Sequence, residues 1–334
     1  MTAAVAVDLG KTGCRAVLWD DGAPSAQDSR EVPGAPGIAA DDGVSMARAA
    51  VRAAVLPLVE RRPGLRLAAV CVGAAGAASA PEAARELAAL LLDDLPADEV
   101  AVTSDAVTAH AGALGGRTGV VLAIGTGSVA IGIGDDGSYA RVDGWGPWLG
   151  DEGSGAWIGA AGLRAALRAH DGRGPDTALL AAAVARFGDP DRLPSAVGRD
   201  GNPARTAASF APDVAHAAAG GDATASAIVR DAATALGEAV LAAARRIGGG
   251  DALPVTITGG LAGLGEPLLG PLRSALADSP HPLQLRPPLG DPLDGARLLA
   301  LNTSAPHEPH VARVRRTTSP PTVPTPPATP PATV

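Results

Sequence analysis

Three glycine-rich turns in this chain of 334 residues combine the groups that bind phosphate. Each follows a hydrophobic run typical of a buried strand, and they span Asp8–Gly13, Gly125–Ser128 and Gly259–Gly265. Glycine lets a phosphate approach backbone N–H groups, and the lysine and hydroxyl side chains of the first two turns offer further contacts. Each of these turns, taken alone, also fits an ordinary β-hairpin turn or strand-to-helix connection. Together they predict a nucleotide site, in which the third turn could carry a phosphate or admit a flat adenine ring.

Acidic residues stand at two further places where a helix is expected to begin. Asp105 follows the predicted strand Val100–Thr103 and fits the N-cap of the next helix. Asp151 and Glu152 precede a predicted helix from about Gly155, where negative charge is favourable. Both places therefore have a structural explanation, and a chemical role must be argued from the motifs around them.

The elements that carry these turns repeat along the chain. A strand, a glycine turn and a returning strand that ends at Asp20–Gly22 come first, and the same order begins again at Val120 and reaches Asp135–Gly137. The Asp-Asp-Gly sequences are typical of hairpins, and two segments that begin alike predict a duplicated domain. In the first third we expect strands at Ala3–Val7, Cys14–Trp19, Leu67–Val72 and Val100–Thr103, and helices at 44–61, 81–92 and from Asp105.

The second half is predicted to be mostly helical. The expected helices cover 155–169, 177–187, 203–219 and 223–247, and a strand at Val255–Thr258 leads into the third turn. A last helix near Asp291–Leu301 ends the fold. Residues 303–334 are predicted to be a disordered tail, because Pro and Thr dominate from Thr317 onward and cannot build a core.

Charge and hydropathy exclude several classes of protein. The formal net charge is −8 and the pI is about 5.2, which argues against a nucleic-acid or anionic-membrane partner. No apolar run reaches the roughly 18 residues of a membrane span, and the start lacks signal-peptide features, so a cytoplasmic location is expected. Cys14 and Cys71 lack the spacing of a zinc or iron–sulfur site. Walker A and GxGxxG sequences are absent from the positions where they bind nucleotides.

The three turns resemble the two phosphate motifs and the adenosine motif of the actin-like ATPase superfamily, which includes acetate and sugar kinases. The segment Asp143–Gly155 also resembles the GWG…GDEGS signature of N-acetylglucosamine kinases, and Thr103–Ala106 is similar to their catalytic strand end. These kinases belong to the BadF/BadG/BcrA/BcrD-type ATPase family, and the similarity covers roughly residues 1–301. It implies an α/β fold of two ribonuclease-H-like domains, with mixed five-stranded sheets flanked by helices and an ATP cleft between them.

The resemblance also implies the division of the chain and its ligands. Residues 1–116 would form the N-terminal domain, closed by the C-terminal helix at 290–302, and residues 117–289 would form the C-terminal domain. ATP and Mg²⁺ are the implied cofactors, and an amino sugar is the implied small-molecule partner. The sequence itself is silent on oligomeric state, but relatives are commonly dimeric, which implies a homodimer.

The family resemblance assigns the nucleotide contacts to the three turns. Asp8 would hold Mg²⁺ through water, since Mg²⁺ keeps much of its hydration shell. Asp105 would take the proton of the sugar hydroxyl or orient that hydroxyl. The implied ATP-binding residues are Gly10, Lys11, Thr12, Gly125, Thr126, Gly127, Ser128, Gly259, Gly260 and Gly263.

The acceptor sugar is assigned to the GWG…GDEGS segment. Asp151 would bind a sugar hydroxyl, and Trp145 and Trp148 would form an apolar wall or pack in the core. The implied substrate-binding residues are Asp105, Gly144, Trp145, Asp151 and Glu152.

The loop at residues 33–43 departs from the family, because it lacks the Asn that usually contacts the sugar. Asp41 or Asp42 could substitute and would suit a positively charged amino sugar. Both N-acetylglucosamine and glucosamine are therefore candidates for phosphorylation at the 6-hydroxyl. The alternative activity is an ATPase that activates or senses through a partner, like the family's dehydratase activators. Those activators hold an iron–sulfur cluster with cysteines in a spacing that this chain lacks.

Overall fold

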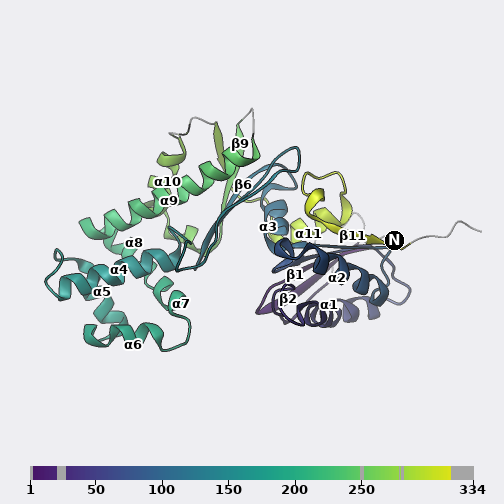
Figure 1. Cartoon of the computed structure of the whole chain (residues 1–334), viewed down its shortest axis with the longest axis horizontal. Coiled ribbons are helices and arrows are strands. Elements are labelled where there is room, and N and C mark those ends of the chain that lie inside the picture. The colour runs from purple at the N-terminus through teal and green to yellow at the C-terminus, as the bar shows by residue number, and fades with distance from the viewer. Residues whose placement is uncertain (1–2, 21–27, 249–251, 278, 280–281, 317–334) are drawn as a thin grey trace, which may run out of the picture.

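The computed structural model describes residues 3–20, 28–248, 252–277, 279 and 282–316, which form two lobes built on two mixed sheets (Figure 1). The first sheet has the strand order β11-β5-β4-β1-β2-β3, and the second has the order β10-β9-β6-β7-β8. The strands of the first sheet are β1 Ala3–Leu9, β2 Gly13–Asp20, β3 Asp28–Pro33, β4 Leu67–Ala74, β5 Glu99–Ser104 and β11 Ala312–Arg315. Those of the second are β6 Gly119–Ile124, β7 Ser128–Ile133, β8 Tyr139–Asp143, β9 Leu253–Thr258 and β10 Leu283–Arg286.

The two sheets repeat one topology. β1 pairs antiparallel with β2 and parallel with β4, just as β6 pairs antiparallel with β7 and parallel with β9. A further antiparallel strand, β3 or β8, lies on one side, and a further parallel strand, β5 or β10, lies on the other. This arrangement confirms the predicted α/β fold with a repeated sheet.

Two pairs of helices cover the faces of the first sheet. Val5 and Val7 of β1 face α1 and α2, while Ala4 and Ala6 face α3 and α11, because successive strand residues point to opposite faces. The elements of this lobe are α1 Gly43–Glu60, α2 Pro81–Asp94, α3 Asp105–Leu114 and α11 Pro292–Leu301, with the 3-10 helices η1 Ala77–Ser79 and η4 Glu308–His310.

The last helix, α11, returns to the first lobe and packs closely against α3 and β1. A Cβ atom on Gly112 of α3 would lie 1.9 Å from the carbonyl oxygen of Asp291. A Cβ atom on Gly295 of α11 would lie 1.9 Å from the carbonyl oxygen of Thr108. Glycine at both positions therefore sets the distance at which the two helices cross.

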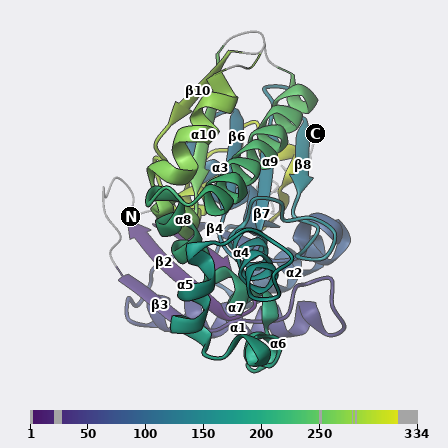
Figure 2. The same cartoon turned by 90° about the vertical axis from the view of Figure 1, so that its left-hand side faces the viewer.

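The long helix α9 packs across β6, β7 and β8 of the second sheet (Figure 2). The helices of this lobe are α4 Gly155–His170, α5 Ala178–Phe187, α6 Leu193–Gly198, α7 Pro203–Ala208, α8 Ala211–Ala219, α9 Ala223–Ile247 and α10 Glu266–Ala277, with the 3-10 helices η2 Pro190–Arg192 and η3 Gly260–Leu264. The prediction of one helix at 203–219 is wrong, because Pro212 cannot donate the N–H that would continue α7. Within the described residues, none of the helices is long and apolar enough to cross a membrane.

The first sheet has six strands where five were predicted, and the predicted tail at 303–334 is wrong in its first part. β11 pairs antiparallel with β5. The Arg313 side chain is only 9% exposed and lies 2.6 Å from Glu99 and 2.6 Å from Glu308. An ion pair with Glu99 of the distant strand β5 and one with the nearby Glu308 therefore order this short charged segment. The Pro/Thr-rich part of the predicted tail, residues 317–334, lies outside the described residues.

The segment from 302 to 316, which we call the C-terminal strap, contacts both lobes. Its His310 places Nε2 at 2.8 Å from the carbonyl oxygen of Gly137, in the turn between β7 and β8. The same hairpin reaches the first lobe, since Ile133 is buried beside α3 and α11, and Tyr139 packs against that cluster. The strap and the hairpin therefore meet where the two lobes join.

Two buried histidines anchor the strap to α3. His110 and His307 are both 0% exposed, and 2.9 Å separates Nδ1 of His110 from Nε2 of His307. Nε2 of His110 lies 3.0 Å from the carbonyl oxygen of Gly119, which can only accept, so this nitrogen carries the proton. His307 then donates through Nε2, and its Nδ1 is a buried nitrogen without a hydrogen-bond partner among the described residues. Both rings are therefore neutral in the folded protein.

We expect the folded protein to lose stability as the pH falls below about 6.5. Burial lowers the pKa of His110 to about 4 and that of His307 to about 3, and the other histidines add to the effect at His307. Unfolded histidine titrates near pH 6.5, so below that pH the unfolded chain binds more protons than the folded one. At about pH 5 each ring should lower the free energy of unfolding by about 2 kcal/mol relative to neutral pH.

Urea unfolding at several pH values between about 5 and 7.5 measures this loss. His110→Gln should flatten the dependence of the free energy of unfolding on pH. The partly exposed His170 serves as a matched control, and His170→Gln should keep the full dependence. Equal slopes in the two variants would contradict the assignment.

Candidate active site

Three carboxylates lie close enough at one edge of the first sheet to influence one another electrostatically. Asp8 lies near the end of β1, Asp105 begins α3 directly after β5, and Asp291 caps α11. Burial raises the pKa of Asp8, the negative charges of Asp105 and Asp291 raise it further, and Arg15 opposes them. A cation at this edge would relieve the repulsion among the three groups.

The donor set at this edge fits a cation that keeps its water. Among the described residues, no three His, Cys, Asp or Glu side chains are grouped so that they could hold a metal ion directly. Mg²⁺ is commonly held by one or two carboxylates together with water and substrate phosphates. The half-buried carboxylate of Asp8 fits that kind of site, and its contact with Mg²⁺ stays a prediction.

Asp105 is not the N-cap of α3, because Ser104 fills that position. The Ser104 hydroxyl accepts a hydrogen bond from the N–H of Val107 at 3.2 Å. The exposed Asp105 carboxylate accepts only from the adjacent N–H of Ala106, at 2.9 Å, among the hydrogen bonds of the described residues. Most of its acceptor capacity is therefore available to a ligand.

A cleft of about 610 Å³ lies beside Asp8 and Asp105 and takes its walls from both lobes. The first lobe contributes the ends of β1 and β5 and the turn after β4, and the second contributes β7 and β8. Its lining residues are Asp8, Gly10, Gly76, Ala78, Ser79, Ser104, Asp105, Ala106, Ala109, Val129, Ile131, Tyr139, Arg141, Gly144 and Pro292. A ligand in this cleft would therefore touch both sheets and three of the predicted motifs, namely the first glycine turn, the strand end at Thr103–Ala106 and the segment Asp143–Gly155.

The first glycine turn is stiffened by the loop at 33–43. Gly10 donates to the carbonyl oxygen of Gly13 at 2.9 Å, and the N–H of Ala35 donates to the carbonyl of Gly10 at 3.2 Å. Lys11 and Thr12 are exposed. The turn thus has a fixed backbone and two exposed side chains.

The second glycine turn is fixed to the start of α4. The N–H of Gly155 donates to the carbonyl of Gly125 at 2.8 Å, and the N–H of Ala156 donates to that of Thr126 at 3.1 Å. The buried Ser128 hydroxyl donates to the carbonyl of Glu152 at 2.9 Å. Thr126 is exposed and presents its hydroxyl to solvent, whereas the hydroxyl of Ser128 holds the next loop.

The third glycine turn forms the 3-10 helix η3, and α10 begins only after it. Gly259 has φ +94°, and a Cβ atom there would lie 2.2 Å from the carbonyl of Ile124, at the end of β6. The third turn is therefore adjacent to the second. Gly260 and Gly263 have open space where a Cβ atom would stand, which suits close approach by a flat ring.

The predicted acceptor residues are only partly brought together. Asp105 and Gly144 line the cleft, whereas Trp145 and Trp148 are 65% and 91% exposed. The Trp145 ring lies under the Arg141 guanidinium, with 4.8 Å from the guanidinium carbon to the ring centroid. Neither tryptophan packs in the core or forms a wall of this cleft.

Asp151 lies against the second turn, and Glu152 is exposed beside it. A Cβ atom on Gly127 would be 2.6 Å from Oδ2 of Asp151, and Oδ1 of Asp151 accepts from the N–H of Gly146 at 3.2 Å. Asp41 and Asp42 are exposed, and neither lines the cleft.

A family profile covers most of the chain. Residues 5–279 match the BadF/BadG/BcrA/BcrD ATPase family. The chain belongs to this family.

Two curated relatives are kinases of amino sugars. The chain is 32% identical over 116 residues to the N-acetylmuramic acid/N-acetylglucosamine kinase of Clostridium acetobutylicum, which is 33% of this chain and 36% of that protein. It is 28% identical over 208 residues to the N-acetyl-D-glucosamine kinase of Dictyostelium discoideum, which is 60% of this chain and 65% of that protein. The matches thus span about a third and just under two thirds of these relatives.

Solved structures share the whole fold. A protein from Chromobacterium violaceum, provisionally named an N-acetylglucosamine kinase, is 28% identical with a TM-score of 0.65 over 90% of this chain and 99% of that one. A provisionally named N-acetylglucosamine kinase from Porphyromonas gingivalis is 22% identical with a TM-score of 0.61, over 88% and 96% of the two chains. At 22% identity, the similarity to the Porphyromonas gingivalis protein shows a shared fold alone.

The cleft of this family member includes residues that the sequence did not single out. The turn after β4 contributes Gly76 and Ser79, and β8 contributes Tyr139 and Arg141. The position of that turn could have been found, because β1, β4 and β5 are parallel and their carboxyl ends share one edge of the sheet. The contribution of β8 depends on how the two lobes meet and has no local signal.

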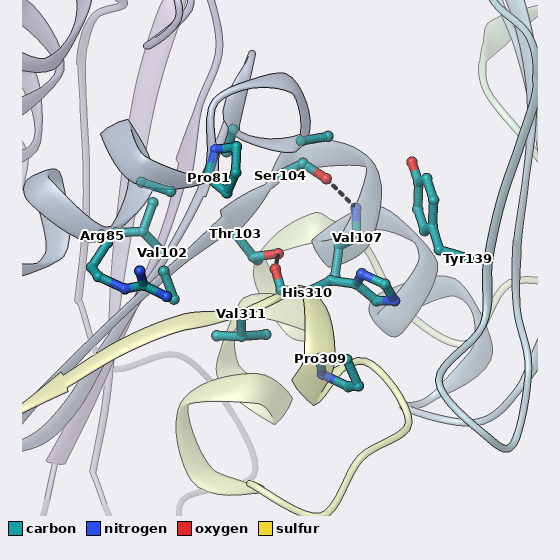
Figure 3. A pocket seen from close by; sticks show the side chains of 14 residues that line it. Pro81, Arg85, Val102, Thr103, Ser104, Val107, Tyr139, Pro309, His310 and Val311 are labelled. Carbon is teal, nitrogen blue, oxygen red and sulfur yellow. Dashed lines mark hydrogen bonds between the residues drawn. The ribbon is translucent and has the colours of Figure 1, made fainter.

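A smaller cavity of about 230 Å³ adjoins the cleft and shares Ala78, Ser104 and Tyr139 with it. Figure 3 shows Arg85 and Tyr139 on opposite sides of this cavity, with strap residues along one wall. The Thr103 hydroxyl donates to the carbonyl of His310 at 2.7 Å. The strap therefore supports the end of β5 that leads into Asp105.

Proposed function

We propose that the chain is an ATP-dependent sugar kinase that phosphorylates the 6-hydroxyl of N-acetylglucosamine or glucosamine. The observation that carries this proposal is the position of the Asp105 carboxylate, which does not cap α3 and lines a cleft between the two lobes. The similarity to amino-sugar kinases supports the substrate class. The proposal divides the chain into a domain at 1–116 closed by the helix at 290–302, and a domain at 117–289.

In this proposal the three turns hold ATP. The fixed backbones of the first two turns, with Lys11 and Thr126, contact the phosphates, and the open surface at Gly260 and Gly263 receives the adenosine. Mg²⁺, held through water by Asp8, would neutralise phosphate charge. The full proposed set is Asp8, Gly10, Lys11, Thr12, Gly125, Thr126, Gly127, Ser128, Gly259, Gly260 and Gly263.

The acceptor sugar lies beside Asp105, which takes the proton of the attacking hydroxyl or orients it. Gly144, Trp145, Asp151 and Glu152 complete the proposed sugar site. The exposed tryptophans and the separation of Asp151 from the cleft suit an open form, and domain closure would bring the sugar residues together and exclude water.

The cysteines argue against the alternative function, an ATPase that works through a partner. The chain has 2 cysteines, Cys14 and Cys71, and both are buried. Burial raises the pKa of each thiol to about 12, so neither offers a thiolate to a cluster shared with a second subunit.

A coupled assay of ADP release tests the proposed function. The rate should rise strongly when N-acetylglucosamine or glucosamine is added to ATP and Mg²⁺, and glucose should give a smaller rise. Identification of the product by NMR gives the phosphorylated position. A rate that is the same with and without any sugar would contradict the kinase and support the partner-dependent ATPase.

A further inference from the structure

The carboxylate of Asp143, the last residue of β8, holds two peptide groups of the next loop. Its Oδ1 accepts from the N–H of Asp151 at 2.8 Å, and its Oδ2 accepts from the N–H of Glu152 at 2.8 Å. The N–H of Trp145 adds a longer contact of 3.5 Å to Oδ1. Each oxygen therefore has its own backbone partner, eight and nine residues further along the chain.

The loop held by Asp143 has a strained backbone, which such hydrogen bonds stabilise. Asp143 and Asp151 have φ of 61° and 56°, in the left-handed region that non-glycine residues rarely adopt. At Gly150 a Cβ atom would lie 2.2 Å from Oδ1 of Asp143, so only glycine lets the carboxylate approach this closely. The strain is located at the two residues that the hydrogen bonds join.

The position of Asp151 follows from this anchor. Its carboxylate lies beside Gly127 in the second glycine turn and accepts from the N–H of Gly146. The Ser128 hydroxyl holds the Glu152 carbonyl from the other side. The segment Asp151–Glu152 is thus tied to β8 through the N–H groups of both residues and to β7 through the carbonyl of Glu152.

We propose that Asp143 is a positioning residue, which acts by fixing the backbone of Asp151 so that the Asp151 carboxylate meets the acceptor sugar. This proposal rests on the proposed function for the role of Asp151. Asp143 itself does not line the cleft, so its effect on the reaction must pass through the loop that it holds.

Asp143→Asn tests the proposal with almost no change of shape. Asparagine keeps one acceptor oxygen but turns the other into a donor, which would face a backbone N–H. We expect KM for the sugar to rise about tenfold or more, KM for ATP to stay within about twofold, and kcat to fall.

Asp222→Asn is the matched control. The Asp222 carboxylate also accepts two backbone N–H groups, from Ala225 at 2.8 Å and from Ala178 at 2.7 Å, but it caps α9 away from the cleft. Its loss should lower Tm about as much as the loss of Asp143 and leave KM for the sugar unchanged. If both variants raised KM for the sugar equally, Asp143 would have only a structural role.

A double-mutant cycle with Asp151→Asn decides whether Asp143 acts through Asp151. If it does, the double variant should have the KM for the sugar of Asp151→Asn alone, and additive effects would overturn the proposal. Hydrogen exchange gives a readout that needs no activity, because the amides of Asp151 and Glu152 should exchange faster in Asp143→Asn. Unchanged exchange would overturn the proposal even in a protein without sugar kinase activity, whereas absent activity with faster exchange would overturn the proposed function alone.

Discussion

Asp105→Asn is expected to lower kcat for sugar phosphorylation by about 10²-fold or more. Asparagine has nearly the same shape but cannot accept the proton of the sugar hydroxyl. The change should leave α3 intact, because Ser104 and not Asp105 caps this helix. KM for ATP should change little, since the phosphates are proposed to bind at the glycine turns. Steady-state ADP release at saturating sugar measures the effect.

The exposed Asp176 provides a control for the same chemical change away from the cleft. Asp176→Asn should keep the wild-type kcat, and both variants should keep the wild-type Tm within about 2 °C. A sugar-stimulated rate that survives in Asp105→Asn would remove Asp105 from the reaction. A large fall of Tm in that variant would show that its carboxylate has a structural role instead.

The strands and glycine turns were predictable because their signals are local. In β1 and β6 a run of small aliphatic residues stops at a glycine, and the returning strand follows within a few residues. The antiparallel pairs β1–β2 and β6–β7 need no distant partner to be recognised. The three glycine turns were therefore placed correctly at strand ends, and the repeat of the two sheets followed from the order of the elements.

The walls of the cleft were harder to predict, since they come from segments far apart in the chain. Tyr139 and Arg141 alternate with buried Ala140 on β8, so they share one face, but the sequence does not say what that face meets. The exposure of Trp145 and Trp148 was missed for a similar reason. Large aromatic side chains usually seek a core, and only the fold shows that this loop projects away from both cores.

The C-terminal strap was missed because its sequence is short, polar and close to the Pro/Thr-rich segment. β11 has four residues, two of which are arginine, and its partner β5 lies some 200 residues earlier. The strap is stabilised by contacts with two buried side chains of the first lobe, Glu99 of β5 and His110 of α3. Such a partner set can be known only when the first lobe has been assembled.

Removal of residues 303–334 is therefore expected to destabilise the protein strongly. The truncation deletes β11 and Arg313 and leaves the Glu99 side chain, which is 10% exposed, without its buried partner. Breaking a buried ion pair from one side typically costs about 3–5 kcal/mol, and lost strand pairing adds to that. For a protein of this size the Tm should fall by about 10 °C or more.

The shorter deletion of residues 317–334 is the matched control, because it removes only residues outside the described part and keeps every contact named above. It should leave both Tm and kcat within error of the full chain. The longer deletion should also lower kcat below its unfolding temperature, since Thr103 loses the His310 carbonyl that supports the strand end before Asp105. If the chain without residues 303–334 kept the wild-type Tm, neither the ion pairs of Arg313 nor the pairing of β11 with β5 would contribute to the stability of the protein. If it lost stability but kept kcat, the strap would support the fold without any influence on Asp105.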